Sequence, residues 1–263
     1  MAKHQSLIER LRELKYRAAL AMKNHREDPE GHGKILFSQE GEDALLGEVF
    51  ASTQKGFYVD VGALHPIRYS NTYSFYLRGW NGINMDATPG SMEPFRKFRP
   101  RDINLECAIS DRTDDLEFFV LNEPSMNTFD RSLVDKYTKD LGYKVVETKR
   151  VRTRPLADVL EEHLPKNQSI DFMDVDVEGF DLQVLTSNNW EAYRPKILLV
   201  ENFTGDFAEF LKSDINRYLE QQKYRLRCRG LRTCMFQSDE SSESFFKTDP
   251  TKRGGQDNGA ETK

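Results

Sequence analysis

The apolar residues of the chain fall into two kinds of pattern that follow one another in turn. Short, nearly continuous apolar runs predict strands, and apolar residues that recur every three to four positions predict helices. The predicted strands cover residues 56–63, 82–87, 102–110, 116–122, 169–179 and 196–203, and a closing antiparallel pair covers 224–230 and 233–238. The predicted helices lie between them at 72–80, 91–99, 155–164, 180–190 and 206–222. This alternation predicts an α/β fold with a mostly parallel sheet that is covered on both faces.

Three segments stand apart from the alternation. Residues 1–33 combine a basic, amphipathic helix over 5–26 with a linker, and residues 238–263 form a polar tail that is predicted to be disordered because it lacks periodic apolar residues. The domain itself is therefore predicted to span residues 34–237. Within it, residues 123–154 are polar and lack a clear period, so they are predicted to form an irregular insertion. This insertion and the N-terminal helix are predicted to carry acceptor specificity.

Length and charge narrow the class of protein. With 263 residues the chain suits one large domain with ragged ends. Its formal charge of −5 provides no global basic surface, so no nucleic-acid partner is predicted. Three cysteines without a C-x-x-C pair argue against a disulfide framework and against a zinc site. Because no apolar run reaches the roughly 18 residues of a membrane-spanning helix, we predict a soluble, cytoplasmic protein; the oligomeric state stays open.

Four of the predicted strands end in acidic residues. The first ends at Asp60 and Gly62, the second at Asp86, the fifth at Asp176 and the sixth at Glu201. In open α/β sheets, ligands bind in the crevice beyond the carboxyl ends of the strands. Burying an unpaired carboxylate costs several kcal/mol, so strands with apolar interiors and acidic ends indicate a ligand crevice.

The turn after the first strand favours one class of cofactor. Asp86 follows Asp60 by 26 residues, where an acid accepts hydrogen bonds from the ribose of a nucleoside cofactor. A dinucleotide also needs a glycine-rich turn for its pyrophosphate, but this turn reads GALHPIRYSNT, with one glycine. S-adenosylmethionine (SAM) has a ribose, a cationic sulfonium and no phosphate. The pattern therefore favours SAM over NAD.

Three sequence blocks carry a more specific signal. They are FSQEGEDALL (37–46), GFYVDVGALHP with SNTYSFYLRGWNGINMDATP (56–66 and 70–89), and IDFMDVDVEGFDLQVLTSNNWEAYRPKILLVEN (170–202). In this order they resemble the FkbM family of SAM-dependent methyltransferases. The resemblance implies a class I methyltransferase fold, which is a Rossmann-like three-layer sandwich with a mostly parallel seven-stranded sheet and one antiparallel strand. It also implies methyl transfer to a hydroxyl of a small acceptor such as a sugar. Asp174 departs from the family pattern, so it inherits no role.

The predicted cofactor site draws on several of these blocks. The resemblance places Gln39, in the first block, over the methionine end of SAM, while Ser38 beside it is a predicted cap of the helix that follows. Asn71 has a second interpretation, because Ser70 to Thr72 also fits a helix cap. The end of the third strand is where the adenine ring would lie. The full predicted set is Gln39, Asp60, Gly62, Ala63, Asn71, Asp86, Ala108, Ile109 and Asp176.

The acids near the end of the fifth strand are the candidate catalytic groups. Asp174, Asp176 and Glu178 alternate and are predicted to share one face of the strand. Clustered carboxylates raise the pKa of one member, which suits a general base that takes the proton of the acceptor hydroxyl. Alternatively, Asp176 and Glu178 hold a divalent cation such as Mg²⁺ together with Glu201. A third hypothesis is that Asp176 or Glu178 caps the helix that follows.

His65 has two possible roles. It follows the first strand beside the predicted cofactor position, where it is a candidate general base; with Pro66 it equally fits a loop-shaping role.

The function of the whole protein also has two alternatives. A catalytically inactive binding or regulatory module that retains the fold is one alternative to an O-methyltransferase. An NAD-linked enzyme is the other, and the glycine pattern disfavours it.

Overall fold

The computed structural model describes residues 34–203 and 205–241. The chain divides into two units, residues 1–36 and 37–263, and the fold given below is that of the second. Of the first unit, residues 34–36 are described and contain no helix or strand. The predicted helix over 5–26 lies outside the described residues, as does the predicted tail beyond residue 241.

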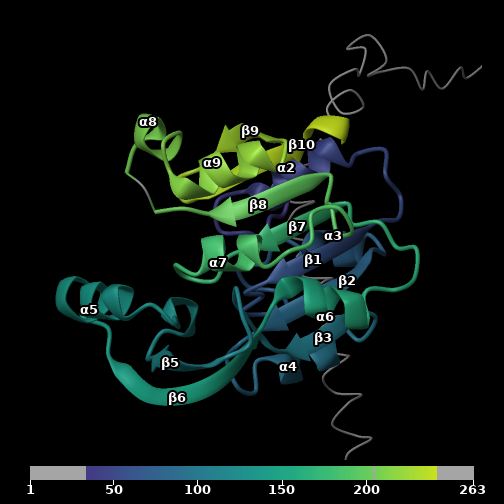
Figure 1. Ribbon diagram of the computed structural model, residues 1–263. Coiled ribbons are helices and arrows are strands. Elements are labelled where there is room, and N and C mark those ends of the chain that lie inside the picture. The colour runs from purple at the N-terminus through teal and green to yellow at the C-terminus, as the bar shows by residue number, and fades with distance from the viewer. Residues whose placement is uncertain (1–33, 204, 242–263) are drawn as a thin grey trace, which may run out of the picture. The chain divides into compact units, whose positions relative to one another are not determined.

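One seven-stranded sheet forms the centre of the second unit (Figure 1). Its strands are β1 (Phe57–Val61), β2 (Asn81–Asp86), β3 (Ile103–Glu106), β7 (Phe172–Val175), β8 (Ile197–Glu201), β9 (Tyr224–Arg229) and β10 (Thr233–Ser238). They lie in the order β3, β2, β1, β7, β8, β10, β9. Neighbours from β3 to β8 pair parallel, and β10 pairs antiparallel with β8 and with β9. The predicted mostly parallel sheet with one antiparallel strand is confirmed.

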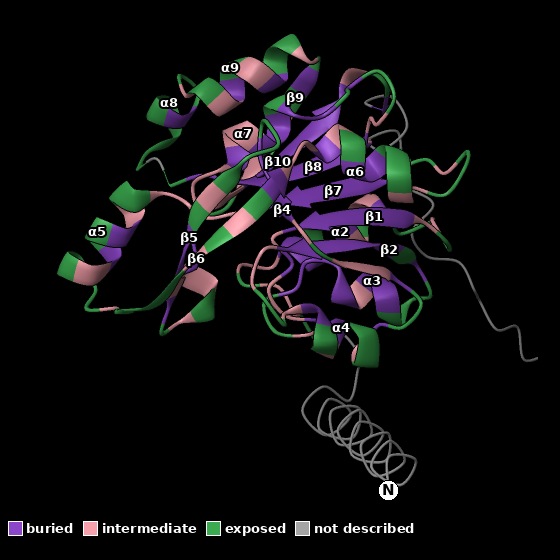
Figure 2. Cartoon of the chain, turned by 60° about the horizontal axis from the view of Figure 1, so that its bottom comes forward, coloured by how far each residue is buried: buried purple, intermediate pink, exposed green. Residues whose placement is uncertain are grey.

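Helices cover both faces of this sheet (Figure 2). Successive side chains of a strand point to opposite faces, so Val59 and Tyr58 of β1 belong to different apolar clusters. The Val59 cluster includes residues of α6 (Leu156–His163), α7 (Asp181–Thr186) and α9 (Asp214–Gln221). The Tyr58 cluster includes residues of α2 (Glu42–Val49) and α3 (Tyr73–Leu77). Because the sheet is covered twice, every residue of β1, β7 and β8 is buried, which explains their continuous apolar runs.

A second, three-stranded sheet connects the domain to an arm, residues 111–154, that projects from the main sheet (Figures 1 and 2). Its strands are β4 (Ala108–Ile109) at the base, β5 (Asp115–Leu121) and β6 (Val145–Arg154), with β6 paired to both others. A 3₁₀ turn, η1 (Pro124–Met126), and a helix, α5 (Arg131–Asp140), lie between β5 and β6. The prediction of an irregular insertion over 123–154 is therefore wrong. Of the residues of β6 only Thr153 is buried, so this strand carries no apolar pattern.

Two other predicted elements differ from the structure. The predicted strand 102–110 divides at Cys107 into β3 and β4, which belong to different sheets. The predicted helix 206–222 divides into α8 (Phe207–Phe210) and α9. The break has a local cause, because Ser213 leaves the helical conformation and its Oγ accepts a hydrogen bond of 3.2 Å from the backbone N–H of Asn216.

The first residues of the predicted tail are ordered. Asp239–Ser241 form a 3₁₀ turn, η2, in which Ser241 is buried. The Ser241 hydroxyl donates to the carbonyl of Lys196 at 3.2 Å, and the backbone N–H of Asp239 donates to the carbonyl of Lys223 at 3.0 Å. The ordered part of the chain therefore extends at least to residue 241.

Candidate active site

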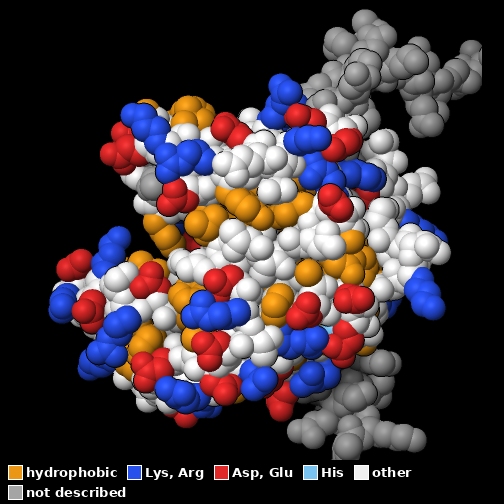
Figure 3. Space-filling model, in the orientation of Figure 1, with side chains coloured by type: hydrophobic (Ala, Val, Ile, Leu, Met, Phe, Trp, Pro, Cys, Tyr) orange, Lys and Arg blue, Asp and Glu red, His pale blue; other side chains and the backbone are white. Residues whose placement is uncertain are grey.

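A cleft opens at the carboxyl ends of β1, β2, β7 and β8, and the arm forms its other wall. The molecular surface is notched between the arm and α8, and apolar side chains lie along the notch (Figure 3). Of the twelve residues predicted for cofactor, catalysis or metal, ten line the cleft. These are Gln39, Asp60, Gly62, Ala63, Asn71, Asp86, Ile109, Asp176, Glu178 and Glu201.

The charge of the cleft is one-sided. Its described lining contains seven carboxylates and one guanidinium, that of Arg232. Arg232 is itself close to a further acid, because its Nε lies 3.6 Å from Oε1 of Glu40. Those carboxylates of the lining that are ionised attract cationic groups and repel phosphates. The seven carboxylates are those of Glu42, Asp60, Asp86, Asp174, Asp176, Glu178 and Glu201.

Gly62 allows the ends of β1 and β7 to approach each other closely. It has a left-handed φ of +93°, and a Cβ atom at this position would lie 1.7 Å from the carbonyl oxygen of Asp176. Its backbone N–H donates to the carbonyl of Met85 at 2.9 Å, which ties the same turn to β2. The floor of the cleft is thus built from three strand ends that leave no room for a side chain here.

We expect Gly62→Ala to be strongly destabilising. The left-handed backbone alone costs a non-glycine residue about 1–2 kcal/mol, and the contact with Asp176 adds to that cost. Gly79→Ala is the matched control, because Gly79 has the same φ of +93° with no atom within 4 Å of its would-be Cβ. Urea unfolding of both variants measures the difference. Equal losses of unfolding free energy would show that the close approach at Gly62 is unimportant.

Asp60 and Asp86 are buried carboxylates with different partners. Oδ2 of Asp60 accepts a hydrogen bond of 2.6 Å from the hydroxyl of Thr72. The two oxygens of Asp86 accept hydrogen bonds from the backbone N–H groups of Leu64 at 2.9 Å and Thr88 at 2.7 Å. Burial raises the pKa of Asp60 to about 6 and also raises the pKa of Asp86. Both acids lie where the strand-end pattern predicted them.

Asn71 links the loop after β1 to β7. Its Nδ2 donates to Oδ2 of Asp174 at 2.7 Å, and its Oδ1 is buried and accepts no hydrogen bond from a described residue. Asn71 does not cap α3, which has Thr72 at its N-cap position and no side-chain cap. The Oγ of Ser70 accepts a hydrogen bond of 3.1 Å from the backbone N–H of Tyr73, the first residue of that helix. Asp174, to which the family pattern gave no role, is buried in the cleft wall. Burial, with the charges of Asp60 and Asp176, raises its pKa well above the ordinary value.

Asp176, Glu178 and Glu201 form the acidic cluster of the cleft. Each offers one carboxylate oxygen, and these oxygens lie within 4.8 Å of one another. Burial and the Asp176 charge raise the pKa of Glu178 to about 8. Burial, again with Asp176 and then Glu178, raises the pKa of Glu201 far above its ordinary value. The cluster therefore holds protons at neutral pH, and Glu178 exchanges its proton near physiological pH.

The backbone of this cluster corrects two predictions. β7 ends at Val175, and Glu178 adopts a left-handed φ of 52°, so the predicted shared strand face of Asp174, Asp176 and Glu178 is wrong. The helix-cap hypothesis is also wrong, because α7 has Phe180 at its N-cap position and no side-chain cap. Asp181 shapes this loop instead, since its carboxylate accepts from the backbone N–H groups of Val177 and Gly179, each at 3.2 Å.

A comparison with protein families identifies the family of the domain that contains this cleft. The family model of the methyltransferase FkbM domain matches residues 60–226. This range covers more than half of the chain and contains β2 to β8 together with the arm. The chain belongs to the FkbM methyltransferase family. The predicted family is thereby confirmed. No curated protein matches the chain.

Two general expectations for this FkbM methyltransferase concern its thiols and a membrane. Its three cysteines, Cys107, Cys228 and Cys234, are free thiols. Within the described part of the chain, no helix combines the length and the apolar surface that crossing a bilayer demands.

Two of the predicted site residues of the FkbM methyltransferase lie outside the cleft lining. His65 is held in its own loop, because its Nδ1 accepts hydrogen bonds from the backbone N–H groups of Ile67 at 3.1 Å and Arg68 at 3.0 Å. Burial and the Arg68 charge lower its pKa. Of the predicted pair on β4, Ile109 lines the cleft and Ala108 does not, because neighbouring strand residues point to opposite sides.

The sequence did not indicate the residues that the arm contributes. Phe118, Met126, Asn127 and Phe129 line the cleft. Tyr137 of α5 donates a hydrogen bond of 2.6 Å from its hydroxyl to Oε2 of Glu178. These residues lie within or beside the segment 123–154, whose lack of a clear period gave no sign of them. Arg232, in the turn between β9 and β10, carried no local signal.

Proposed function

We propose that this FkbM methyltransferase transfers a methyl group from SAM to a hydroxyl of a small acceptor. The observation that carries the proposal is the cleft at the strand ends, in which seven carboxylates face one arginine. Such a lining suits a cofactor with a sulfonium and an amine and disfavours a pyrophosphate. The strand order with its single antiparallel strand supports a class I methyltransferase fold for this domain.

The residues present fit SAM. Asp86 stands at the end of β2, where a carboxylate accepts hydrogen bonds from ribose hydroxyls. The buried, unpartnered Oδ1 of Asn71 and the carboxylate of Asp60 suit the cationic groups of the cofactor. Ile109 and Cys107 offer an apolar surface for its ring. When bound, SAM supplies a methyl group on a positively charged sulfur, which is open to attack by an oxygen.

The acidic cluster then prepares the acceptor. A hydroxyl is a weak nucleophile while it keeps its proton, and a positioned carboxylate that accepts the proton typically accelerates transfer by 10²- to 10⁴-fold. Glu178 is the candidate base, because burial brings its pKa to about 8 and Tyr137 fixes one of its oxygens. Phe118 and Phe129 form an apolar wall beside it, which suits the ring face of a sugar or of another hydroxylated small molecule.

The same cluster supports a second activation mechanism, in which Asp176, Glu178 and Glu201 bind a divalent cation that acidifies the hydroxyl. We expect general-base chemistry, so treatment with EDTA should leave turnover unchanged. Electron paramagnetic resonance with Mn²⁺ gives a direct readout, because a bound ion broadens the free Mn²⁺ signal. Loss of activity with EDTA and recovery with Mg²⁺, together with Mn²⁺ binding that Glu201→Gln abolishes, would replace the base with a cation.

Titration calorimetry tests the proposed function most directly. Wild-type protein is titrated with SAM and separately with NAD, and then incubated with labelled SAM and a panel of hydroxylated sugars. SAM binding with methyl transfer supports the proposal. SAM binding without turnover on any acceptor favours the binding or regulatory module, and binding of NAD instead of SAM overturns the proposal.

A further inference from the structure

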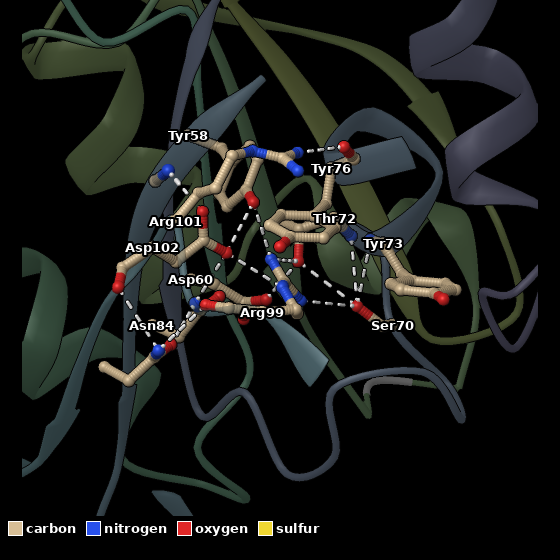
Figure 4. Close-up of polar contacts among 12 residues, drawn as sticks. Tyr58, Asp60, Ser70, Thr72, Tyr73, Tyr76, Asn84, Arg99, Arg101 and Asp102 are labelled. Atoms are coloured by element: carbon tan, nitrogen blue, oxygen red, sulfur yellow. Dashed lines mark hydrogen bonds and ion pairs between the residues drawn. The ribbon is translucent and has the colours of Figure 1, made fainter. Parts of the chain in front are cut away.

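Arg99 is a fully buried cation that contacts Ser70, a residue of the cleft lining (Figure 4). It follows α4 (Met92–Phe98), and its exposed fraction is 0%. The guanidinium is packed against three aromatic rings, with its Cζ 5.2 Å from the ring centre of Tyr58, 5.3 Å from that of Phe95 and 5.5 Å from that of Tyr76. Burying a charge is strongly unfavourable unless it is paired, so the partners of Arg99 indicate its purpose.

One side of the guanidinium forms a structural ion pair. Nε of Arg99 donates to Oδ2 of Asp102 at 2.8 Å, and both side chains are fully buried. Asp102 also accepts hydrogen bonds from the Tyr58 hydroxyl at 2.7 Å, the Gly82 backbone N–H at 3.0 Å and the Asn84 side chain at 3.0 Å. These contacts tie β1, β2 and the loop before β3 together. They explain why Asp102 is buried, but they do not explain the contacts on the other side of the Arg99 guanidinium.

The other side of the guanidinium points toward Asp60 (Figure 4). Nη2 of Arg99 donates to the Thr72 hydroxyl oxygen at 3.0 Å, and Nη1 donates to the Ser70 hydroxyl oxygen at 3.3 Å. The Thr72 hydroxyl in turn donates to Oδ2 of Asp60 at 2.6 Å. A guanidinium only donates and a hydroxyl has one proton to give, so with Arg99 as the donor to Thr72 that proton is free for Asp60. The Thr72 proton must point at Asp60.

We propose that Arg99 is a positioning residue for the cofactor: through the Thr72 hydroxyl it keeps Asp60 ionised and oriented in the cleft. The identity of the ligand rests on the proposed function, whereas the chain from Arg99 to Asp60 does not. Without it, Asp60 would be a carboxyl surrounded by other acids, and it would take up a proton. A protonated Asp60 offers no negative charge to a cationic ligand.

The charges around Asp60 agree with this role. The charges of Asp86 of β2 and Asp176 beyond β7 favour the protonated form of Asp60. Asp174 of β7, which pairs in register with Asp60, has its own pKa raised by the Asp60 charge. Burial also favours protonated Asp60 and is the largest cause of its raised pKa. Arg99 and the Thr72 hydroxyl act in the opposite direction and hold that pKa to about 6. Asp60 is therefore mostly ionised at neutral pH because of this chain.

Thr72→Val tests the inference, because valine keeps the shape of threonine and removes the hydroxyl. Its effect is read by ¹³C NMR of aspartate-labelled protein, with the Asp60 carboxyl signal assigned by its loss in Asp60→Asn. We expect Thr72→Val to raise the pKa of Asp60 by about one pH unit, the scale of one hydrogen bond to a charged group. Thr72→Ser, which retains a hydroxyl, should restore the wild-type value.

Arg101→Met is the matched control for the guanidinium. Arg101 stacks on the Tyr76 ring with its Cζ 3.8 Å from the ring centre, but it has no contact with Thr72 in the network of Figure 4. Arg101→Met should leave the pKa of Asp60 unchanged, whereas a folded Arg99→Lys variant should have a raised pKa of Asp60. An unchanged pKa of Asp60 in Thr72→Val overturns the inference, whatever the chain binds.

Calorimetry with SAM connects the inference to binding. If the pKa of Asp60 rises from about 6 to about 7, its ionised fraction at pH 6.5 falls roughly threefold. SAM affinity of Thr72→Val should fall by that factor at pH 6.5 and match wild type at pH 8.5. Equal affinities of the two proteins at both pH values would overturn the role of Arg99 in binding. Failure of wild-type protein to bind SAM at either pH is a different result and overturns the proposed function.

Discussion

Glu178→Gln is expected to lower turnover by roughly 10²-fold or more while SAM affinity stays near wild type. Glutamine has nearly the same size and retains an oxygen that accepts the Tyr137 hydrogen bond, which is 2.6 Å long in the wild type. It has no carboxylate to take the proton of the acceptor. Calorimetry measures the affinity, and labelled SAM measures turnover on an acceptor found by screening hydroxylated sugars.

The pKa of Glu178 also predicts the direction in which turnover changes with pH. Burial and the Asp176 charge raise the pKa of Glu178 to about 8, and a base works only in its ionised form. Wild-type turnover should therefore rise as the pH increases through about 8, and this rise should disappear in Glu178→Gln. Asp135→Asn, at an exposed position of α5, is the control and should behave as wild type. Full turnover by both Glu178→Gln and Asp176→Asn would show that the cluster is not the catalytic centre.

Asp86→Ala and Asp60→Ala are each expected to weaken SAM binding at least roughly tenfold. A hydrogen bond to a charged group contributes about 1.5–3 kcal/mol, and a single such loss already corresponds to a factor of that order. Asp86 stands at the ribose position of the proposed site and Asp60 faces the cationic groups. Titration calorimetry of the purified variants measures both affinities.

Folding must be separated from binding in this experiment. Asp86 also accepts hydrogen bonds from Leu64 and Thr88, so Asp86→Ala costs some stability, which thermal melting without ligand measures. Asp115→Ala removes an exposed carboxylate at the start of β5 and should change neither property. Wild-type SAM affinity in a folded Asp86→Ala variant would remove Asp86 from the ribose site.

The central strands and their acidic ends could be predicted from the sequence because burial on both faces requires apolar residues along the whole strand. Every residue of β1 and β8 is buried, so their apolar runs are continuous and stop at the cleft. Parallel strands bring their carboxyl ends to one edge, and Asp60 indeed pairs in register with Asp174. Local composition and the direction of the strands were therefore enough to bring most of the predicted residues to one cleft.

The remaining parts depend on contacts that leave no local pattern. β6 has a single buried residue, Thr153, so its strand character comes from pairing with β5 and not from burial. Glu178 leaves the strand alternation because the backbone turns left-handed there, which no apolar period reveals. Arg232 is held at the site by a long-range contact: its backbone N–H donates to the carboxylate of Glu40, 192 residues away in the sequence.

The base of the arm has a consequence for how acceptor range changes among related enzymes. The backbone N–H of Ser110 donates to the carbonyl of Arg154 at 3.0 Å, so the chain leaves the domain and re-enters it at one point. A segment with adjoining ends can be exchanged for another without moving the sheet, which makes residues 111–154 a natural unit for recombination. An exchanged arm would still need two hydrogen-bond donors to Glu178. In this chain the Tyr137 hydroxyl donates to the Glu178 carboxylate, and the Thr128 hydroxyl donates to the Glu178 backbone carbonyl at 2.7 Å. Chimeras that keep these two contacts should change their acceptor and retain their chemistry.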